Sequence, residues 1–303
     1  MSQPAKVLII DDSAVARQTL KNILSEDPEL EVVGTAPDAL IALKKISELN
    51  PDVLTLDVQM PKMDGLTFLE RLMKSRPMPV VMVSSYTQEG SETAMRSLEL
   101  GAVDIIEKPK FEVREGLNEI AILITDKVKA AAQAKMKTAR QIFMQTSPKQ
   151  STEVVLPKTT GKRKTTDQEP LIAIGASTGG TEVLREILSS LPPTLPGIVI
   201  VQHMPKAFTG SFANSLDRVS ELEIKEAEDG DMVESGKALL APGDAHMILK
   251  NNGSSYQAKL DTGELVNRHR PAVDVLFRSV ASIAGSAAVG VILTGMEIGR
   301  AHV

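Results

Sequence analysis

A serine in the second half of this sequence lies where it could act on an acyl group. Ser177 belongs to the segment GASTGG (residues 175–180), between a predicted strand and a predicted helix. This matches the G-x-S-x-G pattern, in which a sharp strand-to-helix turn lifts the serine above the sheet edge and backbone N–H groups can stabilise an oxyanion. Ser177 is therefore a candidate nucleophile. The alternative is that the glycine-rich turn holds a phosphate, as such turns do in dinucleotide-binding folds.

A histidine follows the next predicted strand. His203 comes after the apolar run at residues 197–201. Since consecutive parallel strands are commonly neighbours, His203 and Ser177 could meet at one sheet edge, where a neutral imidazole could take the serine proton. No nucleophile motif accompanies His246 or His269, so we expect both to be structural. The basic segment that holds His269 could instead contact an acidic substrate.

Polar residues also follow predicted strands in the first half of the chain. They are Asp11, Asp12, Asp57, Ser84 and Lys108. Carboxyl ends of parallel strands share one edge of a sheet, and carboxylates gathered there would repel one another unless a cation such as Mg²⁺ joined them. One carboxylate could then accept a phosphoryl group, with the lysine and the serine holding its oxygens. Singly, each residue could be a helix cap or part of a turn; together they indicate a site.

The elements that must position these residues alternate between strand and helix. Apolar runs lie at residues 7–10, 32–33, 53–56, 80–83 and 105–106, with amphipathic stretches between the earlier ones. A similar alternation begins at residue 171. Strands that alternate with helices indicate a parallel sheet covered on both faces. We therefore predict an α/β protein with two doubly wound parallel-sheet domains, the first flavodoxin-like and the second Rossmann-like.

A basic segment separates the two predicted domains. Residues 126–170 contain ten Lys or Arg and four Asp or Glu, although the whole chain has a net charge of −5. Within it, residues 147–170 are rich in Lys, Thr and Pro and lack a periodic apolar face. We place the domains at residues 1–125 and 170–303, with a helical extension and a basic flexible linker at 126–169.

Composition excludes several classes of protein. The chain has 303 residues, enough for about two domains, and 39 acidic against 34 basic residues, which does not favour nucleic-acid binding. The absence of cysteine excludes disulfides and fits a reducing compartment. The N-terminus does not read as a signal peptide, and no apolar stretch reaches the ~20 residues needed to span a bilayer. We expect a cytoplasmic protein with no nucleic-acid partner and no membrane insertion.

The segments IIDDS, LTLDVQMPKMDG, VVMVSS and EKP resemble the receiver domain of two-component response regulators. This resemblance implies that Asp57 is the phosphoryl acceptor and that Asp11 and Asp12 are Mg²⁺ ligands beside it. It also implies a CheA-type histidine kinase as the phosphoryl donor. Many receivers carry an aromatic switch residue three places before the lysine. This sequence has Ile105 there, so signal transfer through an aromatic rotamer is not predicted.

The segments GASTGG, VQHMP, APGD, HRPAVDVLF and VILTGM resemble the catalytic domain of the CheB family of chemotaxis methylesterases. The resemblance implies hydrolysis of glutamate γ-methyl esters, and deamidation of glutamines, on the cytoplasmic helices of chemoreceptors. Ser177 would be the nucleophile and His203 the general base, with Thr178 and Met296 near the oxyanion and substrate, and no cofactor in this domain. The unphosphorylated receiver would cover the site, and phosphorylation would open it.

The end of the chain departs from the family pattern. The family has an Asp three residues after the Met of its TGMG-x-DG motif, and Gly299 stands at that place here. Since the acid orients the histidine of a triad, and spoiling it in serine proteases costs ~10⁴ in kcat, we expect an impaired or inactive esterase. The tail EIGRAHV also resembles translated adapter sequence, so we expect a truncated or artefactual end. Residues 287–293 are predicted to form a buried parallel strand.

Two other functions fit parts of the sequence. A non-enzymatic phospho-switch, whose second domain only binds partners, fits the missing acid but leaves the Ser/His pair at two strand ends without a purpose. A DNA-binding response regulator would need a basic helix-turn-helix after the receiver, and the glycine-rich turn at residues 175–180 does not provide one.

Overall fold

The computed structural model describes residues 3–84, 88–108, 117–134, 169–253, 255–267 and 269–293. Strands and helices alternate in the first part: β1 (Ala5–Ile10), α1 (Ala14–Ser25), β2 (Leu30–Ala36), α2 (Ala39–Leu49), β3 (Val53–Asp57), α3 (Gly65–Ser75), β4 (Val80–Ser84), α4 (Gln88–Glu99), β5 (Asp104–Glu107) and α5 (Leu117–Ala132). The described strands form a parallel sheet in the order β2-β1-β3-β4-β5. The predicted doubly wound sheet is confirmed.

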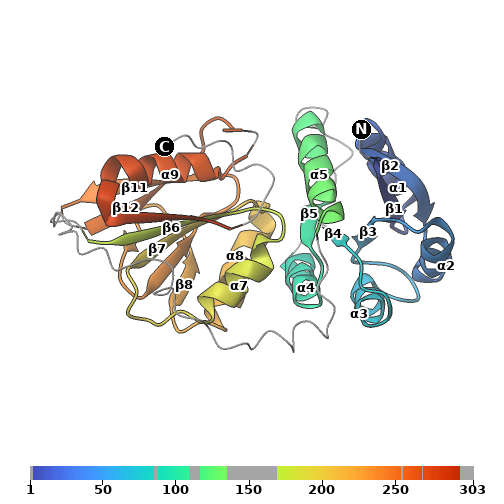
Figure 1. Ribbon diagram of the computed structural model, residues 1–303, viewed down its shortest axis with the longest axis horizontal. Coiled ribbons are helices and arrows are strands. Elements are labelled where there is room, and N and C mark those ends of the chain that lie inside the picture. The colour runs from blue at the N-terminus through green and yellow to red at the C-terminus, as the bar shows by residue number, and fades with distance from the viewer. Residues whose placement is uncertain are drawn as a thin grey trace, which may run out of the picture.

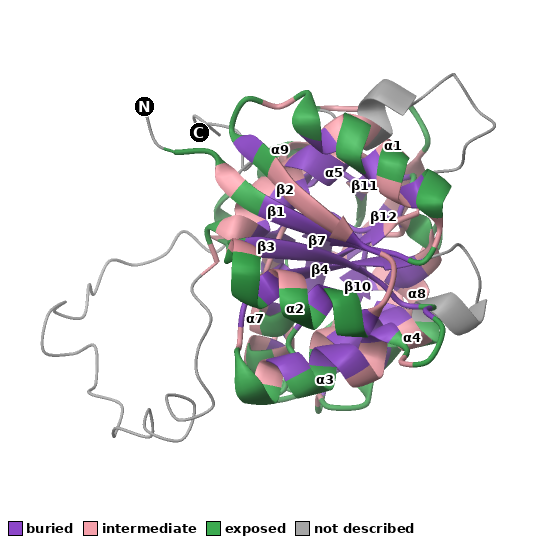
Figure 2. Cartoon of the chain, turned by 90° about the vertical axis from the view of Figure 1, so that its right-hand side faces the viewer, coloured by how far each residue is buried: buried purple, intermediate pink, exposed green. Residues whose placement is uncertain are grey.

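Alternating side chains of β1 explain why helices cover both faces of this sheet. Leu8 and Ile10 belong to the core under α2, α3 and α4, whereas Val7 and Ile9 belong to the core under α1 and α5. All four are fully buried, as a parallel strand between two helical layers requires. Figure 2 shows the buried strands between helices whose outer faces are exposed. The helices cover the faces of the sheet and not the carboxyl ends of its strands, where polar residues can lie.

The second part holds β6 (Leu171–Ala176), α7 (Gly180–Leu188), β7 (Gly197–Gln202), α8 (Lys206–Asp217), β8 (Glu223–Glu226), β9 (Met232–Val233), β10 (Lys237–Leu240), β11 (His246–Asn252), β12 (Ser255–Asp261), α9 (Val273–Ile283), a 3₁₀ turn (Gly285–Ala287) and β13 (Ala288–Ile292). Its main sheet is parallel among the described residues, in the order β13-β6-β7-β10-β8. This confirms the second predicted α/β domain.

The second part also contains an antiparallel sheet that the sequence analysis did not predict. Strands β11 and β12 form a hairpin, and β12 pairs in turn with β9. The hairpin turns at Gly253, whose φ of +71° favours glycine. Its apolar residues, such as Met247 and Tyr256, pack into the core between this sheet and α9. A doubly wound sheet alone is therefore an incomplete description of this domain.

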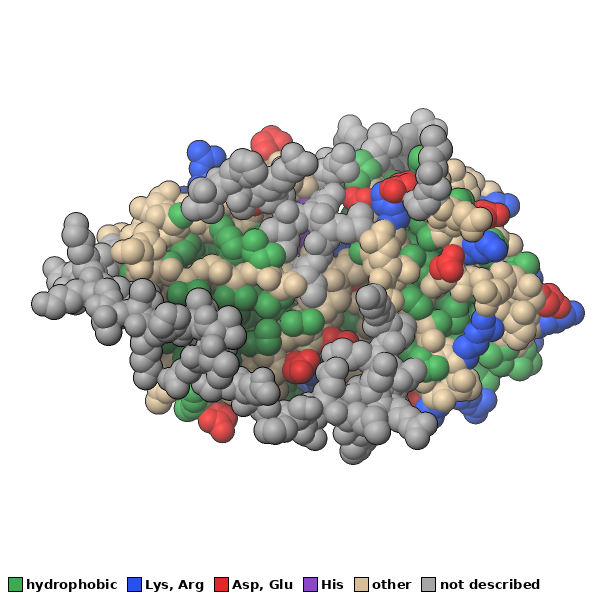
Figure 3. Space-filling model, in the orientation of Figure 1, with side chains coloured by type: hydrophobic (Ala, Val, Ile, Leu, Met, Phe, Trp, Pro, Cys, Tyr) green, Lys and Arg blue, Asp and Glu red, His purple; other side chains and the backbone are tan. Residues whose placement is uncertain are grey.

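The predicted buried strand at the end of the described chain lies at a sheet edge. β13 is parallel to β6, as expected, but Val289 and Ile292 are 49 % and 46 % exposed. The prediction of burial is wrong because β13 lies at the sheet edge, with β6 as its one strand neighbour among the described residues. Phe277 of α9 packs near Gly290, and Val291 and Leu293 are only partly buried against the core that contains Leu184 of α7. Hydrophobic side chains reach the surface in this half of the molecule (Figure 3).

The two parts pack together through helices. α4 of the first part packs against α8 and α7 of the second, and these helices lie side by side in Figure 1. Arg185 Nη2 is 2.9 Å from Glu99 Oε1 across this contact. The predicted extension from residue 126 begins within α5, while the basic cluster at residues 162–164 lies outside the described residues. No described helix is long and apolar enough to cross a membrane.

Candidate active site and carboxylate cluster

The turn after β6 places Ser177 at the carboxyl edge of the second sheet. Ser177 directly follows the strand and is 9 % exposed, and its carbonyl accepts a 2.7 Å hydrogen bond from the N–H of Gly180, where α7 begins. Gly179 takes a φ of +76°, a left-handed conformation that favours glycine. At Gly175 a Cβ would lie 2.4 Å from Val273 Cγ1, so α9 can pack closely only against glycine. Glycine is therefore needed at Gly179 for its backbone conformation and at Gly175 for the close packing of α9.

Strand pairing brings His203 beside Ser177. Residues 171–176 of β6 pair in register with residues 197–202 of β7, and the His203 N–H donates a 3.1 Å hydrogen bond to the Ala176 carbonyl. His203 Nδ1 consequently lies 3.2 Å from Ser177 Oγ. This is within reach of a hydrogen bond between a nucleophile and its base. Gln202 Nε2 donates to the Ser177 carbonyl at 2.9 Å and holds the two strand ends together.

The surroundings of His203 keep its ring neutral. Burial, together with smaller effects of the nearby His269 and Lys127, lowers the pKa of His203 to about 3. His203 Nε2 is buried and has no hydrogen-bond partner within the part of the chain that the structure describes. For Nδ1 to accept the Ser177 proton, the ring hydrogen must lie on this Nε2. A neutral imidazole is the form that can act as a base.

His269 belongs to this site, contrary to the expectation that it is merely structural or a surface contact. Its ring stacks on that of His203, with centroids 3.8 Å apart and planes 11° from parallel. A two-residue bridge with Val266 fixes its backbone through hydrogen bonds of 3.1 and 3.0 Å. The sequence motif HRPAVDVLF contained this residue, but no spacing rule linked it to the distant His203. The stacking arises only when the segment before α9 folds over the end of β7.

The sequence analysis also singled out Thr178, His246, Met296 and Gly299 in the second domain. Thr178 directly follows Ser177 in the turn and is half-buried. Met296 and Gly299 lie outside the described residues. His246 is structural, as expected, because its Nδ1 accepts from the Ala272 N–H at 3.1 Å and its Nε2 lies 2.9 Å from the Glu264 carbonyl.

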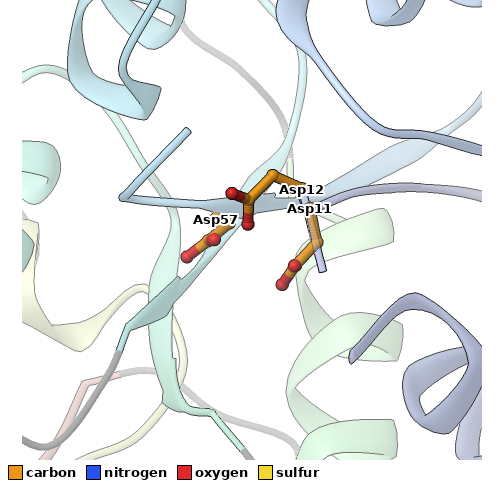
Figure 4. A group of neighbouring side chains, drawn as sticks. All are labelled: Asp11, Asp12 and Asp57. Carbon is orange, nitrogen blue, oxygen red and sulfur yellow. The ribbon is translucent and has the colours of Figure 1, made fainter. Parts of the chain in front are cut away.

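At the edge of the first sheet, Asp11, Asp12 and Asp57 each offer a carboxylate oxygen, and these oxygens lie within 4.8 Å of one another (Figure 4). Asp11 and Asp57 are buried, while Asp12 is exposed. The N–H of Ser13 donates to Asp11 Oδ1 at 2.8 Å, which orients that carboxylate. The hydroxyl of Ser13 caps α1, so Asp12 is not the cap and its carboxylate can turn to the cluster.

Lys108 compensates part of the negative charge. Its Nζ lies 2.8 Å from Asp11 Oδ2 and 2.9 Å from Asp57 Oδ2. Burial raises the pKa of Asp57; Lys108 opposes this effect and Asp11 adds to it. Burial acts against the charge of Lys108, but the two carboxylates outweigh it and raise the lysine pKa. Three carboxylates and one lysine leave an excess of negative charge at this edge. The carboxylates offer oxygen ligands, which are the type that Mg²⁺ prefers. Ser84 ends β4 at the same edge and is buried.

Two family models match different parts of the chain. The family described as CheB methylesterase matches residues 172–298, and that described as response regulator receiver domain matches residues 7–121. A protein from Thiobacillus denitrificans named protein-glutamate methylesterase/protein-glutamine glutaminase is 54 % identical over 96 % of this chain and 80 % of its own length. The chain belongs to the CheB methylesterase family.

This CheB-family chain is also similar to other proteins and solved structures. A similarly named protein from Oleidesulfovibrio alaskensis is 49 % identical over 98 % of this chain and 83 % of its own length. The crystal structure of the Thermotoga maritima CheB methylesterase catalytic domain is 45 % identical, with a TM-score of 0.42, and covers 43 % of this chain and 69 % of that chain. The T. maritima CheB response regulator domain is 39 % identical, with a TM-score of 0.40, over 44 % of this chain and 100 % of that chain.

The stacked histidines generate a first prediction. His269→Ala should let water reach His203 and raise its pKa from about 3 toward the ordinary histidine value of about 6.5. His269→Phe keeps a ring over His203 but removes the ring nitrogens and the charge they can carry, so the increase should be smaller. Titration of ¹³C-labelled histidine rings by NMR measures both variants. Equal pKa values in the wild type and both variants would contradict shielding by the stacked ring.

The lowered pKa of His203 also sets the direction in which the free energy of unfolding changes with pH. Because the folded pKa of His203 is below its unfolded value of about 6.5, the unfolded chain binds more protons between the two values. The contribution of His203 to the free energy of unfolding should therefore fall as pH drops from about 6.5 toward 3. His269→Ala should make this fall shallower, which urea unfolding at several pH values can measure.

The carboxylate cluster generates a second prediction. Asp12→Asn should weaken Mg²⁺ binding about tenfold or more, because it removes one of the charged oxygen ligands. Because Asp12 is exposed, the melting temperature in EDTA should stay close to that of the wild type. Titration calorimetry with Mg²⁺ measures the affinity, and Glu70→Gln on α3 is a matched control that removes an exposed carboxylate elsewhere. Equal affinities in the Asp12 and Glu70 variants would exclude Asp12 as a ligand.

Proposed function

We propose that this chain hydrolyses glutamate γ-methyl esters on the cytoplasmic helices of chemoreceptors and deamidates receptor glutamines. The observation that carries this proposal is the 3.2 Å contact between Ser177 Oγ and the neutral, buried His203 Nδ1. Family membership supports the substrate class, since curated relatives are named protein-glutamate methylesterase/protein-glutamine glutaminase.

The proposed reaction is an acyl transfer. Ser177 Oγ attacks the ester carbonyl while His203 Nδ1 takes the hydroxyl proton, and the oxyanion develops beside the turn at residues 178–180. His203 returns the proton to the departing methoxide, which leaves as methanol, and the receptor glutamate becomes an acyl-enzyme. Water, deprotonated by His203, then attacks the acyl carbon, releases the carboxylate and restores Ser177. With a glutamine substrate, ammonia leaves in place of methanol.

The first sheet would control this reaction. In the proposal Asp57 accepts a phosphoryl group from a CheA-type histidine kinase, Asp11 and Asp12 hold Mg²⁺ with Asp57, and Lys108 and Ser84 hold the transferred oxygens. Mg²⁺ would neutralise charge on the phosphoryl donor. The packing of α4 on α7 and α8 supports a receiver that covers the Ser177 edge and moves on phosphorylation. This is a population shift whose size depends on the differential interface energy.

A binding-only second domain is the alternative. Its support is the absence of an acceptor for His203 Nε2 in the described part of the chain, together with Gly299 at the family's acid position. Without that acid, ring orientation would depend on strand pairing and on the stacked His269. We therefore expect turnover below that of a complete triad.

Ser177→Ala gives the third prediction. A fluorophosphonate probe should label the wild-type chain at Ser177 and leave the Ala variant unlabelled, and methanol release from methylated receptor fragments should disappear with it. Ser189→Ala, at the far end of α7, is a matched control that should react like the wild type. A folded wild-type chain that neither reacts with the probe nor releases methanol would favour the binding-only alternative.

Asp57→Asn gives the fourth prediction. Beryllium fluoride with Mg²⁺, which stands in for an aspartyl phosphoryl group, should raise the labelling rate of Ser177 in the wild type by about fivefold or more. The Asn variant should show no increase, because its amide lacks the carboxylate charge. Glu70→Gln should respond like the wild type. An equal increase in the Asp57 variant would show that the effect does not pass through this residue.

A further inference from the structure

A buried lysine links the two parts of the chain beside the candidate active site. Lys127 of α5 is 3 % exposed, and its Nζ lies 2.6 Å from Asp104 Oδ1, 3.0 Å from the Ile105 carbonyl and 3.4 Å from the His203 carbonyl. An ammonium group has three donors, and these three acceptors match that number. Two of them belong to β5 of the first sheet, and the third belongs to the candidate base of the second.

Strand β5 also leads to the carboxylate cluster. Asp104 and Ile105 begin this four-residue strand, and Lys108 follows it directly. The Lys108 side chain pairs with Asp11 and Asp57. Pairing with β4 makes the short strand a stiff element. Lys108 and the backbone that Lys127 contacts are therefore parts of one short stretch of chain.

Ile105 takes part in this link through its backbone. This position carries an aromatic switch in many receivers, and the isoleucine is packed in the core with no polar group on its side chain. Its backbone carbonyl, however, accepts the Lys127 hydrogen bond. The contact to the second domain therefore runs through main-chain atoms that any residue at this position would supply.

We propose that Lys127 is a positioning residue that couples β5 to His203: it holds the peptide that follows the histidine ring and places a positive charge near that ring. The inference rests on the proposed function, since it concerns regulation of the same Ser177–His203 site. While Lys127 stays in place, an imidazolium on His203 is disfavoured and proton transfer from Ser177 is slow. Withdrawal of Lys127 with β5 makes the imidazolium easier to form and speeds acylation.

The charge of Lys127 supports the proposal that its withdrawal makes the His203 imidazolium easier to form. Lys127 lowers the pKa of His203, after burial and His269. The charged or titratable groups named as acting on the ring are Lys127 from α5 and His269 from the segment before α9, and Ser177 contacts Nδ1. A change at Lys127 thus alters one of few charges that the ring senses.

The test compares Lys127→Met with Lys129→Met in the full chain. Lys129 lies on the same helix, but it pairs with Asp27, Glu29 and Asp126 of the first part. Fluorophosphonate labelling of Ser177 is measured from pH 5 to 9 with and without beryllium fluoride and Mg²⁺. For Lys127→Met we expect basal labelling to rise about fivefold and the activation ratio to fall by a similar factor. Lys129→Met should stay within about twofold of the wild type.

A double variant protects the test against misfolding. Lys127→Met alone leaves the buried Asp104 without its charged partner. Asp104→Leu combined with Lys127→Met removes both charges, and such replacements are often tolerated. This double variant should also show raised basal labelling and a raised His203 pKa by NMR. The inference is wrong if a folded Lys127 variant shows the same basal labelling, the same activation ratio and the same His203 pKa as the wild type. If Ser177 is unreactive in every chain the proposed function fails, and the NMR titration still decides the inference.

Discussion

The register between β6 and β7 is the constraint on which the second domain's chemistry depends. It sets the hydrogen bond from the His203 N–H to the Ala176 carbonyl, and so places the histidine one residue past its strand and beside Ser177. A one-residue slip would turn every side chain of the strand to the opposite face. Main-chain pairing therefore sets the 3.2 Å contact, and the Gln202 side chain and the stacked His269 ring support it.

The two sheet edges use opposite electrostatic arrangements. At the first, burial and the neighbouring Asp11 raise the pKa of Asp57, and Lys108 pairs with both carboxylates. At the second, burial and two nearby cationic or titratable groups keep His203 neutral. The excess negative charge at the first edge thus favours a cation, and the second edge holds a neutral imidazole. Both follow from polar residues that stand at the ends of buried parallel strands.

The sequence predicted what depends on local pattern. Apolar runs indicated the parallel sheets, and the position of Ser177 and His203 after consecutive strands predicted their proximity. The stacking of His269, the reach of Lys127 to His203 and the antiparallel sheet of β9, β11 and β12 were missed, because each arises from contacts between segments far apart in the chain. The exposure of β13 was missed because an apolar run gives no sign of which strand lies at a sheet edge. The roles of Ser177, His203 and Asp57 stay predictions.

The edge position of β13 has a consequence for handling the protein. Among the described residues its outer side pairs with no strand, and Val289 and Ile292 add exposed apolar surface. Unpaired N–H and C=O groups beside such side chains are a template on which another chain can add a strand. Self-association through the β13 edge would increase with protein concentration. It would reduce the amount of monomer without altering either polar site.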